Sequence, residues 1–122
     1  MTSIPSVPRP TEIRLSEDRC SLTIGFDSGE EFTLSAEYLR VESPSAEVRG
    51  HSPSERKIIG GCRNLTISRL EPVGHYALRI LFADGHDTGL YSWTYLLELG
   101  RDYPTIWANY LKALGEKGLA RE

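Results

Sequence analysis

The feature that most limits the fold of this chain is a weak internal repeat. The segment LTIGFDSGEEFTLSAEYLR, residues 22–40, aligns with LRILFADGHDTGLYSWTYLLE, residues 78–98, and the YL pairs match after one inserted residue. Five further matches share an offset of 56 positions: Leu22, Ile24, Phe26, Gly29 and Leu34 correspond to Leu78, Ile80, Phe82, Gly85 and Leu90. A repeated pattern indicates a repeated supersecondary unit, so both segments should adopt the same local structure.

Each copy predicts three strands followed by a short helix, because apolar and polar residues alternate with a period of two. In the first half we expect strands at EIRL, CSLTIGF and EEFTL, then a helix at AEYLR that Ser35 caps. In the second half we expect strands at NLTISRL, HYALRILF and HDTGLY, with a turn at EPVG. The helix WTYLLEL follows, capped by Ser92 and ended by Gly100. The sequence therefore predicts an α+β domain built from two three-stranded antiparallel β-meanders.

A C-terminal amphipathic helix and two tails complete the predicted organisation. The segment YPTIWANYLKAL has a proline at an early helical position, where proline is tolerated. One apolar face is expected to carry Ile106 or Trp107, Tyr110, Leu111 and Leu114. We expect a flexible proline-rich tail at residues 1–10, a single domain at 11–115 and a C-terminal tail at 116–122.

Composition and charge argue against several classes of function. The net charge is −3 and the basic residues are scattered, which disfavours nucleic acid or an anionic membrane as the partner. No apolar run approaches the roughly 20 residues that span a bilayer, and the N-terminus has no secretory signal, so we expect a cytoplasmic protein. Cys20 and Cys62 have no CxxC pairing and should be reduced thiols. Because phosphate-binding loops, nucleophile elbows and HExxH motifs are all missing from the sequence, we expect no catalytic residue and no enzyme activity.

The stretch FADGHDTGLYSW, residues 82–93, places a histidine beside two aspartates. Its Asp-Gly dipeptide is a strong hairpin signal, because glycine accepts positive φ and aspartate supports the turn. In the first copy Ser28 and Glu30 take the positions of Asp84 and His86, so the turn itself does not require a histidine. His86 is expected to begin the next strand near the surface.

His86 could in principle act as a general base or as a metal ligand. Asp87 is its neighbour in a predicted strand and should point to the opposite face, which argues against a histidine–aspartate dyad. A metal site would need two or three partners, and zinc favours cysteine and histidine in tetrahedral geometry. The possible partners are dispersed along the chain: His51, His75, Asp84 and Cys62.

Residues 42–63 form a long stretch without hydrophobic periodicity. A 22-residue irregular connection is unusual inside a compact domain, and such loops are typically functional or disordered. The aromatic residues near the last two helices favour a minor core, with their polar atoms near its rim. The residues proposed for an interaction surface come from the loop, the adjoining turn and this aromatic group: Arg49, His51, Arg63, Asp84, His86, Tyr91 and Trp93.

The pattern LRVESPSAEVRGH, followed by EPVGHYALRILFADGHDTGLYSWTYLLELG, closely resembles a bacterial family called domain of unknown function 971. That family is similar to the N-terminal domain of γ-butyrobetaine hydroxylase. The resemblance covers residues 11–101, and the segments SPSAEVRGH and F-x-DGH-x-x-GxYSWxYL are specific to it. It implies an accessory module that, in the hydroxylases, lies beside an iron- and 2-oxoglutarate-dependent catalytic domain. We expect no hydroxylase activity, because the catalytic residues belong to that other domain.

The resemblance also implies the remains of a zinc site. In the hydroxylases the module binds structural zinc through three cysteines of an LRDNCPCSDC-like run and one downstream histidine. Aligned on the shared Leu-Arg, the cysteine positions fall on Ser43, Ser45 and Val48, and the histidine position falls on His86. Serine and valine are poor or impossible zinc ligands, so we expect neither a metal nor another cofactor. His86 is the best residual metal ligand.

Two functional hypotheses follow. The leading hypothesis is a small non-catalytic accessory or adaptor module that acts through protein–protein contact. Similar modules are fused to Mrp-type P-loop ATPases, which suggests partners that handle iron–sulfur clusters or metals. The alternative is an iron- or zinc-binding protein that uses His86 with other histidine, aspartate or cysteine residues. A small-molecule enzyme ranks third.

Overall fold

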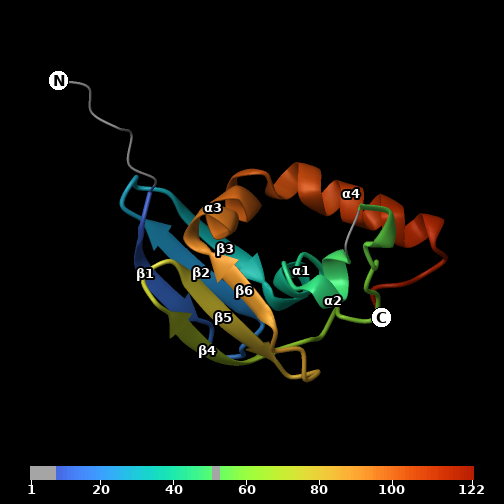
Figure 1. Cartoon of the computed structure of the whole chain (residues 1–122), viewed down its shortest axis with the longest axis horizontal. Coiled ribbons are helices and arrows are strands. Elements are labelled where there is room, and N and C mark those ends of the chain that lie inside the picture. Colours follow the sequence, from blue (N-terminus) through green and yellow to red (C-terminus); the bar gives the residue numbers. More distant parts are fainter. Residues whose placement is uncertain (1–7, 51–52) are drawn as a thin grey trace.

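Two three-stranded antiparallel sheets form the body of the protein, with strand orders β1-β2-β3 and β4-β5-β6. The structure is a computed structural model that describes residues 8–50 and 53–122. The strands are β1 (Pro10–Leu15), β2 (Ser21–Phe26), β3 (Glu31–Ser35), β4 (Ile67–Val73), β5 (Ala77–Phe82) and β6 (Gly89–Ser92). The helices are α1 (Ala36–Val41), α2 (Ala46–Arg49), a 3₁₀ turn (Pro53–Glu55), α3 (Trp93–Arg101) and α4 (Tyr103–Glu116). The predicted α+β fold with a C-terminal helix is confirmed (Figure 1).

The repeat predicted from the sequence is present in the backbone of both halves. Each second strand is joined to the third by a turn whose glycine has positive φ, 89° at Gly29 and 92° at Gly85. In each turn the amide of the preceding phenylalanine donates to the carbonyl one residue beyond the glycine, at 2.8 Å and 2.9 Å. Ser35 and Ser92 then cap α1 and α3 by accepting backbone amides at 3.0 Å and 3.1 Å. The two halves therefore use the same local chemistry.

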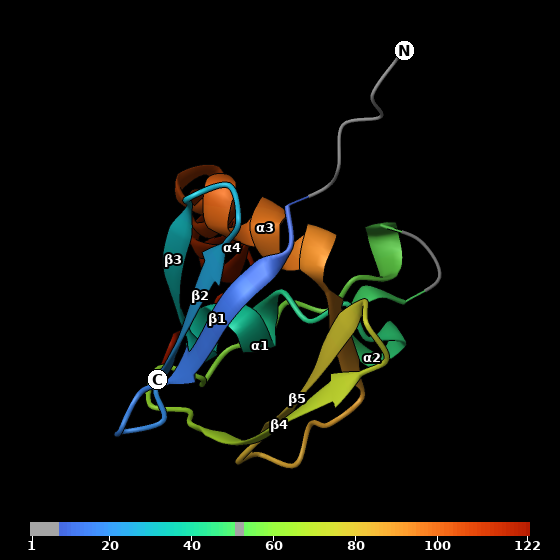
Figure 2. The same ribbon diagram turned by 90° about the vertical axis from the view of Figure 1, so that its left-hand side faces the viewer.

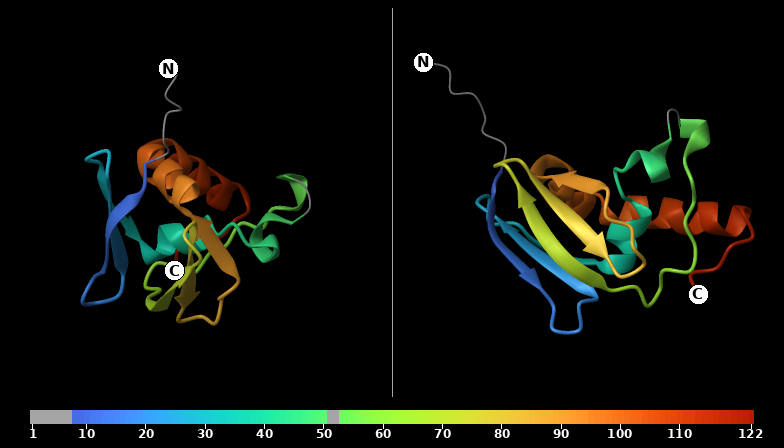
Figure 3. Two further views of the ribbon diagram at one scale, coloured as in Figure 1. Left: turned by 60° about the vertical axis from the view of Figure 1, so that its left-hand side comes forward. Right: turned by 60° about the horizontal axis from the view of Figure 1, so that its bottom comes forward.

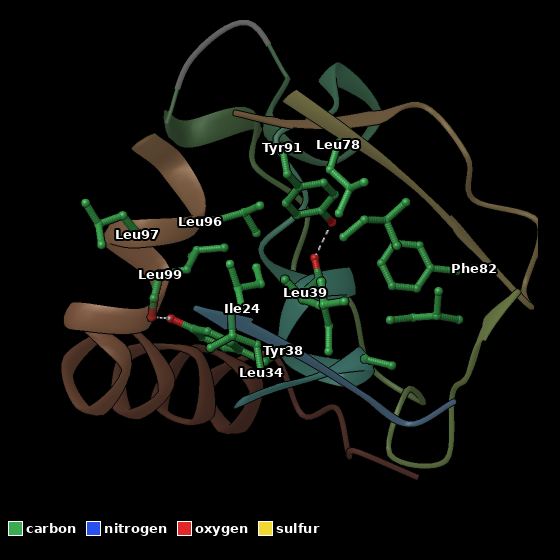
Figure 4. Packing of buried hydrophobic residues seen from close by; sticks show 14 of the residues in the cluster. Ile24, Leu34, Tyr38, Leu39, Leu78, Phe82, Tyr91, Leu96, Leu97 and Leu99 are labelled. Atoms are coloured by element: carbon green, nitrogen blue, oxygen red, sulfur yellow. Dashed lines mark hydrogen bonds between the residues drawn. The ribbon is translucent and has the colours of Figure 1, made fainter. Parts of the chain in front are cut away.

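The core lies between the two sheets, and both repeats supply residues to it. Figure 2 shows the β1–β3 sheet on one side of α1 and strands β4 and β5 on the other. Apolar side chains at equivalent positions of β2 and β5 are at most 3% exposed, and helices α1 and α3 add further buried residues to the same cluster (Figure 4). These strand residues are Leu22, Ile24, Phe26, Leu78, Ile80 and Phe82.

A reciprocal pair of tyrosine hydrogen bonds joins the two repeats. The Tyr38 hydroxyl of α1 donates to the Leu99 carbonyl of α3 at 2.7 Å (Figure 4). The Tyr95 hydroxyl of α3 donates to the Glu42 carbonyl at the end of α1 at 2.6 Å. When the inserted residue of the repeat is counted, Tyr38 corresponds to Tyr95, and Glu42 corresponds to Leu99. Each phenol thereby satisfies a carbonyl near the C-terminal end of the other helix, where intrahelical partners run out.

Described residues near both ends of the chain, which were assigned to tails, make contacts with the domain. Residues 1–7 of the predicted proline-rich tail lie outside the described residues, but Pro10 belongs to β1 and pairs with Phe26. Proline is tolerated there because β1 is an edge strand. At the C-terminus the Gly61 amide donates to the Ala120 carbonyl at 3.0 Å, and Arg121 pairs with the buried Glu37 at 2.7 Å. Residues 119–121 are therefore fastened to the domain, beside the end of the loop (Figure 3).

Two strand boundaries, the structure of the loop and the exposure of one side chain depart from the sequence prediction. Strand β4 runs through Pro72, where a turn was expected, and it can do so because β4 is an edge strand. Strand β6 begins at Gly89 rather than His86, since the side chains of His86 and Thr88 bond to the loop and the ladder with β5 reaches only to Gly89. The loop at 42–63 contains α2 and the 3₁₀ turn. On α4, Tyr110 and Leu114 are buried as predicted, but Leu111 is 40% exposed.

The described part of the chain has no helix with the length and apolar character required to cross a bilayer.

Gly100 was expected just beyond the end of its helix, but it lies inside α3. A Cβ atom at this position would meet the Phe32 ring of β3 at 2.4 Å. Glycine is therefore required for close packing of α3 against the first sheet, although it is a poor helix former.

We predict that Gly100→Ala lowers the free energy of unfolding by about 1–3 kcal/mol, because the Phe32 ring must move out of its packed position. Urea denaturation measures the change. Gly115→Ala is the matched control, since a Cβ there meets nothing within 4 Å. The control should be neutral or raise stability by up to about 1 kcal/mol through helix propensity. Equal effects of the two substitutions would contradict this account of α3.

Candidate functional site

The candidate site lies where the loop after α1 crosses the turn between β5 and β6. Asp84 begins this turn, and its carboxylate accepts the backbone amide of His86 at 3.0 Å. The same carboxylate pairs with Arg40 of α1 at 2.8 Å, which attaches the turn to the helix. On the loop side Ser45 caps α2 by accepting the Glu47 amide at 3.2 Å. These local contacts place α2 over the histidine.

His86 is the centre of a polar chain that runs from the buried Ser43 to the exposed Glu47. Its side chain is 3% exposed, so the prediction that it lies near the surface is wrong, because the loop covers it. The imidazole Nδ1 lies 3.1 Å from a Glu47 carboxylate oxygen, and Nε2 lies 2.8 Å from the Ser43 hydroxyl. Since a carboxylate accepts hydrogen bonds, this network assigns the hydrogen to Nδ1 and makes Nε2 the acceptor of the Ser43 hydroxyl.

Two of the positions aligned with the zinc-binding cysteines hold serine hydroxyls, which bond to the loop backbone and to the turn. The Ser43 hydroxyl, besides contacting His86, accepts the Ser45 amide at 3.3 Å. The Ser45 hydroxyl lies 2.6 Å from that of Thr88. Val48 is 1% exposed and supplies an apolar side chain of α2. Residues of this chemistry do not fit zinc, and they fasten the loop to the turn by hydrogen bonds instead.

Burial sets the protonation of His86. Desolvation lowers the pKa of the imidazole below its ordinary 6.5, and the Arg40 guanidinium lowers it further. Glu47 and Asp84 oppose this shift but do not reverse it. Burial tends to raise the pKa of Asp84, whereas the His86 amide and Arg40 lower it, and the net direction is downward. At neutral pH the site therefore holds a neutral imidazole next to an Arg–Asp ion pair.

The order hydroxyl, imidazole, carboxylate in Ser43, His86 and Glu47 is that of a nucleophilic catalytic site. Such a site requires a hydroxyl that a substrate can reach. Ser43 is 0% exposed. What the hydrogen bonds from His86 to Ser43 and Glu47 do in this structure is to attach the loop to the turn.

Of the predicted metal partners that the structure describes, His75 and Cys62 form no metal-binding group with His86. Across residues 8–50 and 53–122, no group of three or more histidine, cysteine, aspartate or glutamate side chains could hold a metal ion. His75 is exposed before β5, and His51 lies outside the described residues. Cys62 is buried with residues of α4, and burial raises the pKa of its thiol, which opposes thiolate chemistry.

A second polar group, which the sequence reasoning missed, lies on the other side of the loop. The Glu42 carboxylate is 5% exposed and lies 2.8 Å from Arg56 and 3.5 Å from Arg49. Burial raises the pKa of Glu42, and the two arginines act against the rise. Arg49 also donates to the Ser43 carbonyl at 3.1 Å and to the Tyr95 hydroxyl. Nothing in the local pattern marks Glu42 or Arg56, because their partners depend on the course of the loop.

The remaining residues predicted for an interaction surface lie in three different environments: a groove, the core and the exposed surface. Trp93 lines an open groove of about 400 Å³ together with residues that precede β1, precede β5 or lie at the start of α3: Pro8, Arg9, His75, Tyr76, Ser92 and Thr94. Tyr91 was also proposed for the surface, but it is 0% exposed and belongs to the core, where its hydroxyl donates to the Leu39 carbonyl. Arg63 is exposed and pairs with Glu122.

Comparisons with known proteins agree with this architecture. The family model described as "Gamma-butyrobetaine hydroxylase-like, N-terminal" matches residues 13–97. One similar NMR solution structure is 40% identical, covers 96% of this chain and 92% of its own, and has a TM-score of 0.81. A second NMR structure is 43% identical, with coverage of 100% and 91% and a TM-score of 0.81.

A crystal structure from Acidithiobacillus ferrooxidans ATCC 23270 is also similar. It is described as a protein with unknown function of the DUF971 family. It is 34% identical, with coverage of 75% of this chain and 92% of that chain, and its TM-score is 0.63. No curated protein matches the chain.

We predict that His86 makes the stability of the protein depend on pH. Its pKa is lower in the folded chain than the ordinary 6.5, so the unfolded chain binds the proton more readily. The stability that the folded chain gains by holding His86 neutral is complete above pH 6.5 and is lost as the pH falls below this value. Urea denaturation at pH 7.5 and 5.5 should show a smaller loss of stability in His86→Gln than in the wild type. His75→Gln, at an exposed histidine, is the control and should keep the wild-type loss. An identical pH dependence in His86→Gln and the wild type would refute the prediction.

Proposed function

Because the chain belongs to the gamma-butyrobetaine hydroxylase-like N-terminal family, which is also the DUF971 family, we propose that it is a small non-catalytic accessory module. It works in the cytoplasm by binding a partner protein. The observation that carries this proposal is the open aromatic groove beside β5. The polar chain at His86 serves the module by holding the loop in one conformation.

The groove has the chemistry of a protein-binding surface. Tyr76 is 60% exposed, the most exposed large hydrophobic side chain of the described residues. Trp93 is half-buried, and its indole donates to the His75 carbonyl at 2.9 Å, which fixes the ring in the groove wall. Exposed tyrosine and tryptophan supply rigid contact area and are enriched among the residues that dominate binding energy.

The partner segment that suits this groove is extended and contains proline. Pro8 of this chain already borders the groove, just before β1. Grooves lined by aromatic rings accept proline-rich segments because such segments are extended before they bind. Proteins that handle iron–sulfur clusters or metals are the proposed class of partner, by analogy with the fused modules that the sequence resembles.

We predict that Tyr76→Ser removes partner binding. Tagged wild type and variant are incubated with cell extract, cross-linked and compared by quantitative mass spectrometry. At least one protein should be captured tenfold less by Tyr76→Ser, because aromatic residues at the centre of an interface often contribute about 2 kcal/mol or more. Leu111→Ser is the matched control, since Leu111 is also exposed but lies on α4. Capture that is the same for all three proteins would contradict the proposal.

A second prediction separates this role from the metal-binding alternative. Protein purified without a His-tag should contain far less than one equivalent of zinc or iron, and His86→Ala should not change the content. The reason is the donor set around His86, which consists of hydroxyl groups and a single carboxylate. One equivalent of metal in the wild type, lost in His86→Ala, would establish the alternative instead. Elemental analysis by mass spectrometry measures both.

A further inference from the structure

A cavity of about 380 Å³ lies between the loop and helices α3 and α4, and it shares no lining residue with the aromatic groove. Its volume is within the range of small-molecule sites, which start near 300 Å³. One wall is apolar and comes from three elements: Ile58, Leu99, Ile106 and Ala113. The opposite end is formed by Glu42, Arg49 and Arg56, the polar group described above. The cavity thus combines an apolar wall with one charged end.

The charged end carries an excess of positive charge. Two guanidinium groups face a single carboxylate, that of Glu42, which is 5% exposed. Arg49 donates to two backbone carbonyls and to the Tyr95 hydroxyl. Arg56 pairs with Glu42 through Nη2, and its side chain lines the cavity and is 29% exposed, so part of the guanidinium group is open to a ligand. An arginine at the end of a cavity is a suitable donor for an acceptor that a ligand supplies.

We propose that this cavity binds a small organic carboxylate. Its carboxylate accepts hydrogen bonds from Arg56 and balances the excess charge of the two arginines. Its apolar part lies against Ile58, Leu99 and Ile106. Arginine is suited to this task, because its planar fork of donors matches a carboxylate.

The other polar side chains of the cavity fix the orientation of the ligand. Glu98 lines the cavity from the exposed face of α3, and its negative charge repels a carboxylate from that side. Asn109 lines it from α4 and offers an amide to any further polar group. The ligand carboxylate is therefore directed toward Arg56. A neutral molecule of the same shape would make no charge-assisted hydrogen bond with Arg56.

The test compares a carboxylate with its neutral counterpart. Protein labelled with nitrogen-15 is titrated with 4-phenylbutyrate and, separately, with 4-phenylbutanamide, and amide chemical shifts are followed by NMR. The carboxylate should bind at least tenfold more tightly than the amide, since only the carboxylate makes charge-assisted hydrogen bonds. Its shift changes should concentrate at the amides of Arg56, Ile58 and Asn109. Equal affinities, absence of binding, or shift changes elsewhere on the molecule would each overturn the proposal.

Three variants complete the experiment. Arg56→Gln should reduce the affinity for 4-phenylbutyrate at least tenfold. Ala113→Leu should do the same by filling the cavity without changing any charge, and it keeps the test valid if Arg56→Gln fails to fold. Arg63→Gln removes an exposed arginine elsewhere and should leave the affinity unchanged. Unaltered binding in a folded Arg56→Gln or Ala113→Leu protein would exclude this cavity as the site. The aromatic groove and its partner are unaffected by either result.

Discussion

The reciprocal hydrogen bonds of Tyr38 and Tyr95 are the interaction on which the arrangement of the two repeats depends. Each phenol reaches across the molecule to a carbonyl near the end of the other repeat's helix, so neither helix is complete without the opposite repeat. Burial raises the pKa of both hydroxyls, which keeps them protonated and able to donate. A contact made twice between equivalent positions is the pattern of a two-fold symmetric interface, here formed within one chain. These bonds join α3, which packs closely against the first sheet at Gly100, to the end of α1, where the loop begins.

The same turn position serves different purposes in the two repeats. In the first, Glu30 remains on the outside and pairs with Arg101 at 2.6 Å, which lowers the pKa of Glu30 to about 2. In the second, His86 turns inward and bonds to the loop, and the residues after it leave the strand ladder. The backbone of the turn is unchanged, since its glycine and its closing hydrogen bond are the same. The second repeat therefore loses strand pairing at this point and gains the anchor for the loop.

The distinction between local and long-range contacts explains which features could be predicted from the sequence. Strands, turns and caps depend on residues close together in the chain, so the alternation in β2 and β5 and the serines before α1 and α3 were sufficient to predict them. The burial of His86, the position of Gly100 inside α3 and the pairing of Glu42 with Arg56 depend on partners from other elements. No local pattern carries that information. Tyr91 was misplaced on the surface for the same reason, because its burial is decided by Leu39, more than 50 positions away.

The loop after α1 contributes residues both to the His86 site and to the cavity at α3 and α4. One side of it covers His86, where Ser43 bonds to the imidazole and Ser45 bonds to Thr88 of the turn. The other side supplies Glu42, Arg49 and Arg56 to the cavity at α3 and α4. Arg49 belongs to both, since it bonds to the carbonyl of Ser43 and lines the cavity. The polar chain at His86 is therefore best understood as a support for the surface residues of the loop. The proposed function assigns binding to the surfaces that the loop and the aromatic groove present, and it assigns to His86 the role of holding the loop against the turn.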